Sequence, residues 1–374
     1  PPQVGQPVRL AELVAQLEVG GLLANLHAHV APCLGWCHGD AAPQVVARRL
    51  VRQDAIVAHV PDLLIPSPGA RGLATQDAGA LVGTTVRAWD LFLDAAADAD
   101  LAAPARHHGW TGTQVLLIVG DWPQNRGLRD IVADARAGRT GEVDQAADVR
   151  AVHAAHADIS PADALAAVQR GRDELAAWFA SDEPAEVGLL PTRSLLGTLP
   201  VLTLLHATAY QLAVSALDLV ACGAPESDEL TRIGLTALVD STGALAVRAG
   251  VSASLTAVTP RRPGVDHDVE PLVVGLGAQD GDWRTEVLEA APPGAPAIHA
   301  DARTILDITS GRISDVPRLY RSGDLAVTEL PGLLALAPVI SDVPGIPGGA
   351  ALGRALSFMN GVGSLLGRLG FGRR

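Results

Sequence analysis

The pattern of apolar residues predicts several amphipathic helices along the chain. In residues 79–99, Val82, Val86, Trp89 and Leu93 follow one another at intervals of four, three and four positions. This spacing places the four side chains on one face of a helix. We therefore expect the first helix of a bundle in this segment.

Another helix is predicted to begin at the SPAD motif of residues 160–163. A serine that can cap a helix is followed there by a proline suited to the first turn and by an acidic residue. The apolar face of this helix consists of Leu165, Val168, Leu175 and Phe179. A further apolar helix is expected from about Thr198 to Cys222, where Gly223 and Pro225 are stop signals.

The run GWTGTQVLLIVGDW at residues 109–122 is almost wholly apolar after its Gly-Trp-Thr opening. Its content of Val, Leu and Ile suits a buried strand as well as a helix, so periodicity leaves both readings open. As a helix it completes a four-helix bundle over residues 77–224, interrupted by a long excursion around residues 123–160.

The pattern changes after residue 225, where one helix is predicted from Asp228 to Gly250. Two alternating stretches follow, and the sequence DGD at 280–282 between such runs indicates a hairpin. Residues 295–312 have the pattern of a strand followed by a helix, and RLYRSGDLAVTEL at 318–330 that of a strand with a turn. Strands mixed with helices in this order predict a small α/β sandwich over residues 225–342.

The two ends of the chain differ from this core. Residues 1–76 are interpreted as an N-terminal helical extension, with helices expected at 8–30 and 42–60. Residues 343–374 read as a Pro/Gly linker and a basic tail, in which apolar residues recur at helical spacing beside four arginines. Residues 350–374 are expected either to touch an anionic membrane surface or a protein partner, or to pack as a last helix on the protein itself.

Composition narrows the function classes. Apolar residues make up 48% of the 374 residues and charged residues 18%, which is a globular balance. All 28 basic residues are arginine, and the net charge of −13 shows no basic stripe that would contact phosphates, so nucleic acid is not an expected partner. The acidic residues within the first apolar stretch argue against a signal peptide, and three cysteines fit a reducing compartment. We expect a cytoplasmic protein.

Several short motifs occur together in a recognisable order. These are the helix-one pattern, Gly109-Trp110-Thr111, the segment TAYQLAVSALDL ending at Leu219, and ITSGR followed by SGDLAV. Over residues 79–340 the chain thereby resembles the mycothiol-dependent maleylpyruvate isomerase family. The resemblance implies an α+β protein, with a DinB-like four-helix bundle followed by a small sterol-carrier-protein-like α/β domain.

The same resemblance implies a metal site in the bundle, and this chain departs from it. The family's metal-binding histidine, about eight residues beyond the Trp, corresponds to Ile118. The family's Glu and His, four residues apart on the fourth helix, correspond to Gln211 and Ser215. Transition metals prefer imidazole nitrogen and carboxylate oxygen, so these three side chains should not hold one. We expect neither a metal nor another cofactor in the bundle.

Two other groups of residues are further candidates for chemistry. His206 and Tyr210 lie four residues apart on the fourth helix and are possible catalytic residues, although burial in the core explains them as well. In the N-terminal extension, the segment LHAHVAPCLGWCHGD gathers five possible metal ligands, namely His27, His29, Cys33, Cys37 and His38. A loop with buried thiols is the alternative interpretation of that segment.

The leading hypothesis is a divergent, metal-less relative of these isomerases that serves as a non-catalytic binding or assembly protein. The first alternative is an active mycothiol-dependent isomerase or thiol transferase that uses zinc on rearranged ligands. The second is a carrier of lipid or another apolar small molecule, whose groove would be lined by Leu325, Val327, Leu333 and Leu336.

Overall fold

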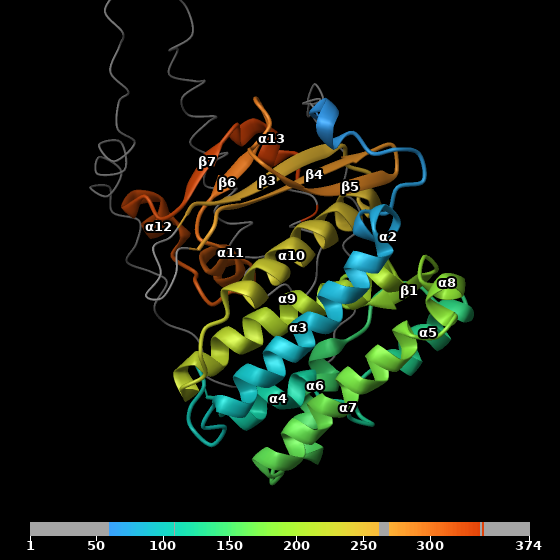
Figure 1. Cartoon of the computed structure of the whole chain (residues 1–374), viewed down its shortest axis with the longest axis vertical. Helices are drawn as coiled ribbons and strands as arrows, with labels where there is room; N and C mark the ends of the chain where they lie inside the picture. The colour runs from blue at the N-terminus through green and yellow to red at the C-terminus, as the bar shows by residue number, and fades with distance from the viewer. Residues whose placement is uncertain (1–59, 108, 262–268, 337–338, 340–374) are drawn as a thin grey trace, which may run out of the picture. The chain divides into compact units, whose positions relative to one another are not determined.

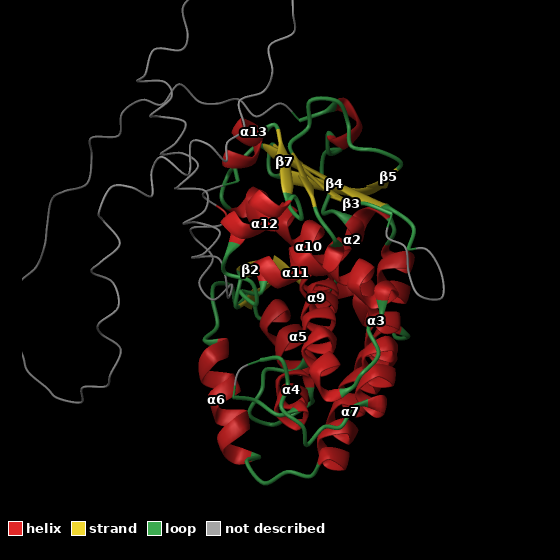
Figure 2. Ribbon diagram, turned by 90° about the vertical axis from the view of Figure 1, so that its left-hand side faces the viewer, coloured by secondary structure: helices red, strands yellow, loops and turns green. Residues whose placement is uncertain are grey.

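The computed structural model describes residues 60–107, 109–261, 269–336 and 339. Helices form the first part of this described chain, and a mixed five-stranded sheet with short helices follows (Figures 1 and 2). The expected helices at 8–30 and 42–60 and the tail at 343–374 lie outside the described residues.

Four helices pack together in the helical part. They are α3 (Ala78–Asp98), α4 (Gly112–Val119), α7 (Pro161–Phe179) and α9 (Val201–Leu219), which a single turn, η2 (Val220–Cys222), extends. Helix α3 lies against both α7 and α9, and so does α4 (Figure 1). Their buried side chains form one hydrophobic core, in which Leu81, Phe92, Leu116 and Leu212 are almost fully shielded from solvent.

In the structure the ambiguous run is a helix, α4. Its first turn is stabilised by two reciprocal hydrogen bonds between Thr111 and Gln114. The Thr111 hydroxyl accepts a hydrogen bond from the Gln114 amide at 3.3 Å, and the Gln114 side-chain oxygen accepts one from the Thr111 amide at 2.9 Å. This capping box satisfies two amide groups that a helix end leaves free. A strand would have left both side chains without these partners.

The predicted helix start at Ser160 is confirmed, since the Ser160 side chain accepts from the Asp163 amide. The excursion between α4 and α7 contains two further helices, α5 (Leu128–Arg136) and α6 (Gln145–Ala155). After α7, a short helix α8 (Glu183–Val187) precedes the hairpin of β1 (Pro191–Ser194) and β2 (Gly197–Pro200). The helix predicted from about Thr198 to Cys222 is confirmed as α9 with η2; it begins at Val201, because residues 197–200 pair with β1.

The sheet has the strand order β5-β4-β3-β6-β7. Its strands are β3 (Ala253–Thr259), β4 (Leu272–Gln279), β5 (Asp282–Leu288), β6 (Ala297–His299) and β7 (Ala326–Thr328). Among these described strands, β3 and β6 are parallel and the other neighbouring pairs are antiparallel. The predicted hairpin at residues 280–282 is confirmed: Asp280 and Gly281 both have positive φ, 54° and 86°, as the tight turn between β4 and β5 requires.

The strand predicted within residues 318–330 is β7 (Ala326–Thr328), but the first part of that segment, RLYRS, belongs to helix α12 (Val316–Ser322). The Asp315 side chain accepts from the Arg318 amide at 3.1 Å, and Pro317 occupies the first turn. The helix ends at Gly323, whose φ is 84°. Two more short helices, α11 (Ala302–Thr309) and α13 (Leu330–Leu334), complete the described elements of this part.

Helix α10 (Asp228–Arg248) connects the two hydrophobic cores. It packs along α9 on one side and against β4 and β5 on the other (Figure 1). Leu230 and Ala237 belong to the core of the helical part, whereas Leu235 and Val239 belong to the core beneath the sheet. Helices α9 and α10 are long and apolar enough to cross a membrane, but most of each apolar window is buried inside the protein.

The segment just before α3 packs on the sheet through a short turn, η1 (Asp62–Leu64), and a short helix, α2 (Leu73–Gln76). Leu64 is fully buried and lies over Gly275 and Gly277 of β4, where a Cβ atom would come within 3 Å of it. The glycines therefore make room for this segment.

Asp240 of α10 ties the same segment to the sheet. Its Oδ1 atom accepts hydrogen bonds from the Leu73 amide at 3.2 Å, the Trp283 indole at 3.1 Å and the Thr285 hydroxyl at 2.7 Å. The Oδ2 atom has no partner among the described residues. Burial raises the pKa of this fully buried carboxyl, although the three hydrogen bonds act in the opposite direction.

Asp240→Asn is expected to remove a pH dependence of stability. The pKa of Asp240 is higher in the folded than in the unfolded protein. The contribution of Asp240 to the free energy of unfolding is therefore complete below the unfolded pKa of about 4 and falls as pH rises through the folded pKa. Asparagine keeps an acceptor without the charge. Urea unfolding across this pH range should show the free energy of unfolding falling more steeply in the wild type than in the variant. Equal slopes would contradict the prediction.

Candidate functional site

The three positions that the resemblance assigns to metal ligands lie on α4 and α9, which pack against each other. Ile118 is half-buried and offers an alkyl side chain. Ser215 is 1% exposed, and its hydroxyl accepts a hydrogen bond from the Gln211 side-chain amide at 3.2 Å. An alkyl group, a neutral amide and a hydroxyl do not form the donor set that zinc prefers, so these residues do not fit the metal.

The part of the chain that the structure describes brings together no three His, Cys, Asp or Glu side chains as possible metal ligands. The cluster His27, His29, Cys33, Cys37 and His38 lies outside the described residues, so the hypothesis of a metal site there stays a prediction. Cys222, the remaining cysteine and the last residue of η2, is buried, and burial raises the pKa of its thiol.

His206 is buried and Tyr210 is half-buried, and each is bonded to a different neighbouring helix. The Nδ1 atom of His206 lies 3.2 Å from the Thr85 hydroxyl of α3, and burial lowers the pKa of this imidazole to about 4. The Tyr210 hydroxyl donates to the Thr309 hydroxyl of α11 at 3.2 Å, and burial raises the pKa of this phenol to about 12. At neutral pH both side chains are uncharged.

Aromatic and imidazole rings gather at the Gly-Trp-Thr turn. The ring of Trp110 stacks on His107 with centroids 4.1 Å apart and contacts His153 of α6 at 4.7 Å. A second pair, Trp122 and His156, lies 4.3 Å apart. Burial lowers the pKa of His153, which favours the neutral ring. Helix α6 of the excursion thus packs against the start of α4.

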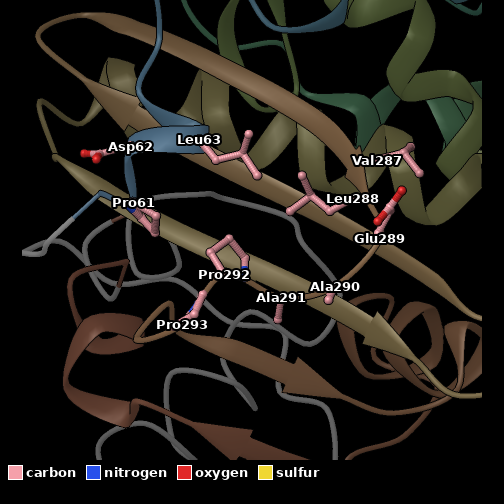
Figure 3. Close-up of a pocket in the computed structure, with 10 residues that line it drawn as sticks. All are labelled: Pro61, Asp62, Leu63, Val287, Leu288, Glu289, Ala290, Ala291, Pro292 and Pro293. Carbon is pink, nitrogen blue, oxygen red and sulfur yellow. The ribbon is translucent and has the colours of Figure 1, made fainter.

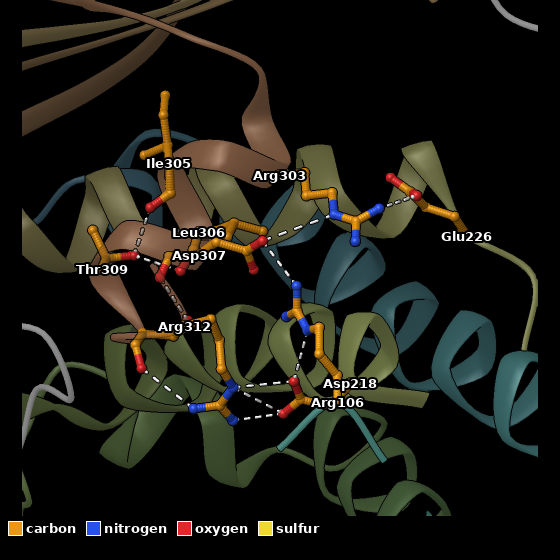
Figure 4. A network of polar contacts seen from close by, with 10 residues as sticks. Arg106, Asp218, Glu226, Arg303, Ile305, Leu306, Asp307, Thr309 and Arg312 are labelled. Carbon is orange, nitrogen blue, oxygen red and sulfur yellow. Dashed lines mark hydrogen bonds and ion pairs between the residues drawn. The ribbon is translucent and has the colours of Figure 1, made fainter. Parts of the chain in front are cut away.

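Charged side chains from both parts of the protein meet at the end of α9 (Figure 4). Arg312, directly after α11, donates from Nε and Nη2 to Asp218 of α9, with the shorter contact at 2.5 Å. Arg106, just before the Gly-Trp-Thr turn, bonds to Asp218 at 3.1 Å and to Asp307 of α11 at 2.8 Å. We call Arg106, Asp218, Asp307 and Arg312 the junction cluster.

The junction cluster is buried and balanced in charge. The Asp218 and Asp307 side chains are 3% and 7% exposed, and two guanidinium groups offset their two charges. Burial lowers the pKa of Arg106, but the two carboxylates outweigh it and raise the value. Arg303 extends the network from Asp307 to Glu226. Of its buried polar atoms, Arg106 Nη2 and Asp307 Oδ1 lack a partner among the described residues.

Sequence reasoning singled out the motifs of this cluster but not the contacts. Asp218 belongs to the segment TAYQLAVSALDL and Arg312 to ITSGR, yet the two are 94 positions apart in the chain. Arg106 precedes the Gly-Trp-Thr turn by a few residues and carried no signal beyond its charge. The structure thus shows that two of the separate motifs meet at one place, joined by Arg106 from the segment before the third.

The proposed lipid groove residues are part of a packed core in the structure. Leu325, Leu333 and Leu336 are buried in the hydrophobic core beneath the sheet, and Val327 packs against it. A surface pocket of about 720 Å³ lies elsewhere, between η1 and the end of β5 (Figure 3). Pro61, Leu63, Val287 and Pro292 are among its lining residues, and none of the possible ligand or catalytic residues is.

Comparison with solved structures shows similarity to the mycothiol-dependent maleylpyruvate isomerase. One crystal structure of that protein has 14% sequence identity and a TM-score of 0.41, and a mutant of it has 13% identity and a TM-score of 0.43. Each match covers 69% of this chain and 95% of the other. No protein-family model matches the sequence, and no curated protein matches it.

Proposed function

We propose that this chain is a metal-less relative of the mycothiol-dependent maleylpyruvate isomerases and acts as a cytoplasmic, non-catalytic binding or assembly protein. The observation that carries the proposal is the donor set at the three ligand positions. Ile118 offers no lone pair, and the Gln211 amide is engaged with the Ser215 hydroxyl. A helical frame without nitrogen or carboxylate donors at these positions has no means of holding a catalytic zinc ion.

The remaining candidates for acid–base chemistry support the same proposal. Efficient general acids and bases have pKa values near the working pH. The pKa of His206 is about 4 and that of Tyr210 about 12, so both values lie far from neutrality. Both side chains also have hydrogen-bond partners in the packed interior, which suits a structural role.

The proposal assigns partner binding to the basic tail at residues 350–374, which would dock to a protein or to an anionic membrane surface. Its support is charge: the tail carries four arginines and no acid, and the rest of the chain is strongly acidic. A tail of this kind attracts an anionic surface while the acidic body resists it.

A turnover assay tests the proposal. The full chain is mixed with mycothiol and maleylpyruvate, with zinc, nickel or manganese added in turn. With each metal, we expect the isomerisation rate to equal the rate measured in the absence of the protein. Saturable turnover would contradict the proposal. If this turnover were lost in His206→Ala but kept in the matched control His299→Ala of β6, the activity would be assigned to the buried His206.

A further inference from the structure

The structure contains a second arginine cluster, which shares no residue with the junction cluster. Asp134, near the end of α5, is 1% exposed and bonds to three arginines. Arg126 comes from the turn before α5, Arg139 from the loop after it, and Arg193 from β1. We call these four residues the Asp134 cluster.

The contacts fix the three guanidinium groups around one carboxylate. Arg126 donates to Asp134 Oδ2 from Nε at 3.1 Å and from Nη2 at 2.8 Å, and Nη2 also bonds to the Thr192 hydroxyl. Arg193 donates from Nε to the same oxygen at 2.6 Å. Arg139 donates from Nε to Oδ1.

The Asp134 cluster is therefore not balanced in charge. Three positive charges and one negative charge leave a net charge of +2, whereas two arginines and two aspartates cancel in the junction cluster. Hydrogen bonds and charge from the arginines hold the pKa of Asp134 well below its usual range, against the effect of burial. Arginine stays protonated, so the excess persists at every physiological pH.

The excess charge faces solvent. Arg139 and Arg193 use only Nε on Asp134, and their Nη1 and Nη2 groups make no hydrogen bond or ion pair with any described residue. Their side chains are 55% and 41% exposed. On the neighbouring helix α8, Glu183 and Glu186 pair with Arg136.

We infer that Arg139 and Arg193 form a binding site for a phosphate group. Planar guanidinium forks match phosphate oxygens, and a dianionic phosphate would balance the charge of +2. Because Asp134 already holds both side chains in place, binding loses less side-chain entropy than binding to two free arginines. The phosphate is either inorganic phosphate or the phosphate group of a small monoester.

Isothermal titration of the full chain tests this inference at low ionic strength. Inorganic phosphate is one probe and glycerol 3-phosphate is the other, and tighter binding of the second would assign the site to monoesters. We expect saturable binding that is at least about tenfold weaker in Arg139→Gln/Arg193→Gln, because charge-assisted contacts are lost. The matched control is Arg129→Gln on α5. Arg129 pairs with Glu174, outside the Asp134 cluster, so this variant should bind phosphate like the wild type.

The conservative variant Arg139→Lys/Arg193→Lys separates charge from geometry. It keeps the net charge but loses the forks, so its affinity should lie between those of the wild type and the glutamine variant. Thermal unfolding without phosphate establishes that each variant is folded. Absence of saturable binding in the wild type would overturn the inference, and so would equal affinity in the wild type and the folded glutamine variant.

Discussion

Replacing Asp218 with Asn is expected to lower the free energy of unfolding by about 3–5 kcal/mol, because removing one member of a buried ion pair leaves its partner uncompensated. Arg312 loses its carboxylate partner, while Arg106 retains Asp307. Urea unfolding followed by tryptophan fluorescence measures the change. The effect should be large because the Asp218 side chain is 3% exposed and connects α9 with the segment after α11.

Two variants serve as controls for Asp218→Asn. Glu229→Gln breaks an ion pair with Arg87 whose side chains are 52% and 48% exposed, and the loss of stability should be small, because water screens exposed pairs. Asp218→Asn/Arg312→Met removes both charges of one pair and should recover part of the lost stability. Equal effects of Asp218→Asn and Glu229→Gln would show that the junction cluster contributes no more than a surface pair.

Replacing Asp134 with Asn is expected to lower the free energy of unfolding by about 3 kcal/mol, which is at the low end of the range for a broken buried ion pair. Three arginines lose their shared carboxylate, but the exposed Arg139 and Arg193 can turn towards water. The matched control is Asp130→Asn on the same helix, which is exposed and should lose at most about 1 kcal/mol of helix-dipole interaction.

The cost of Asp134→Asn should depend on pH in a defined direction. The pKa of Asp134 is lower in the folded than in the unfolded protein, so its contribution is complete above the unfolded value of about 4. It is lost as pH falls from there towards the folded value. The difference in unfolding free energy between wild type and variant should thus shrink in acid. A difference that is independent of pH would contradict the assigned contacts.

Local signals in the sequence predicted much of the fold. Ser160 and Asp163 predicted the start of α7, and the DGD turn predicted the β4–β5 hairpin. Both features depend on residues that lie within a few positions of one another. The same kind of signal was present but unused at Thr111 and Gln114, whose capping box decides that α4 is a helix.

The remaining features depend on contacts between distant residues. RLYRS has the composition of a strand, and the Asp315 cap and Pro317 determine its helical start. Arg106 and Arg312 of the junction cluster, and Arg139 and Arg193 of the Asp134 cluster, are ordinary charged residues in the sequence. Only the packing of α5, α9, α11 and β1 brings them to their carboxylates. Ligand positions on α4 and α9 were inferred from the resemblance and not from periodicity.

Metal content measured after zinc equilibration and desalting tests the central claim most directly. The sample is the full chain with His27, His29, Cys33, Cys37 and His38 all replaced by Ala, so that zinc held by that segment does not enter the result. The account predicts no retained zinc, because Ile118, Gln211 and Ser215 supply no suitable donor set. One equivalent of zinc per chain in this variant would contradict it.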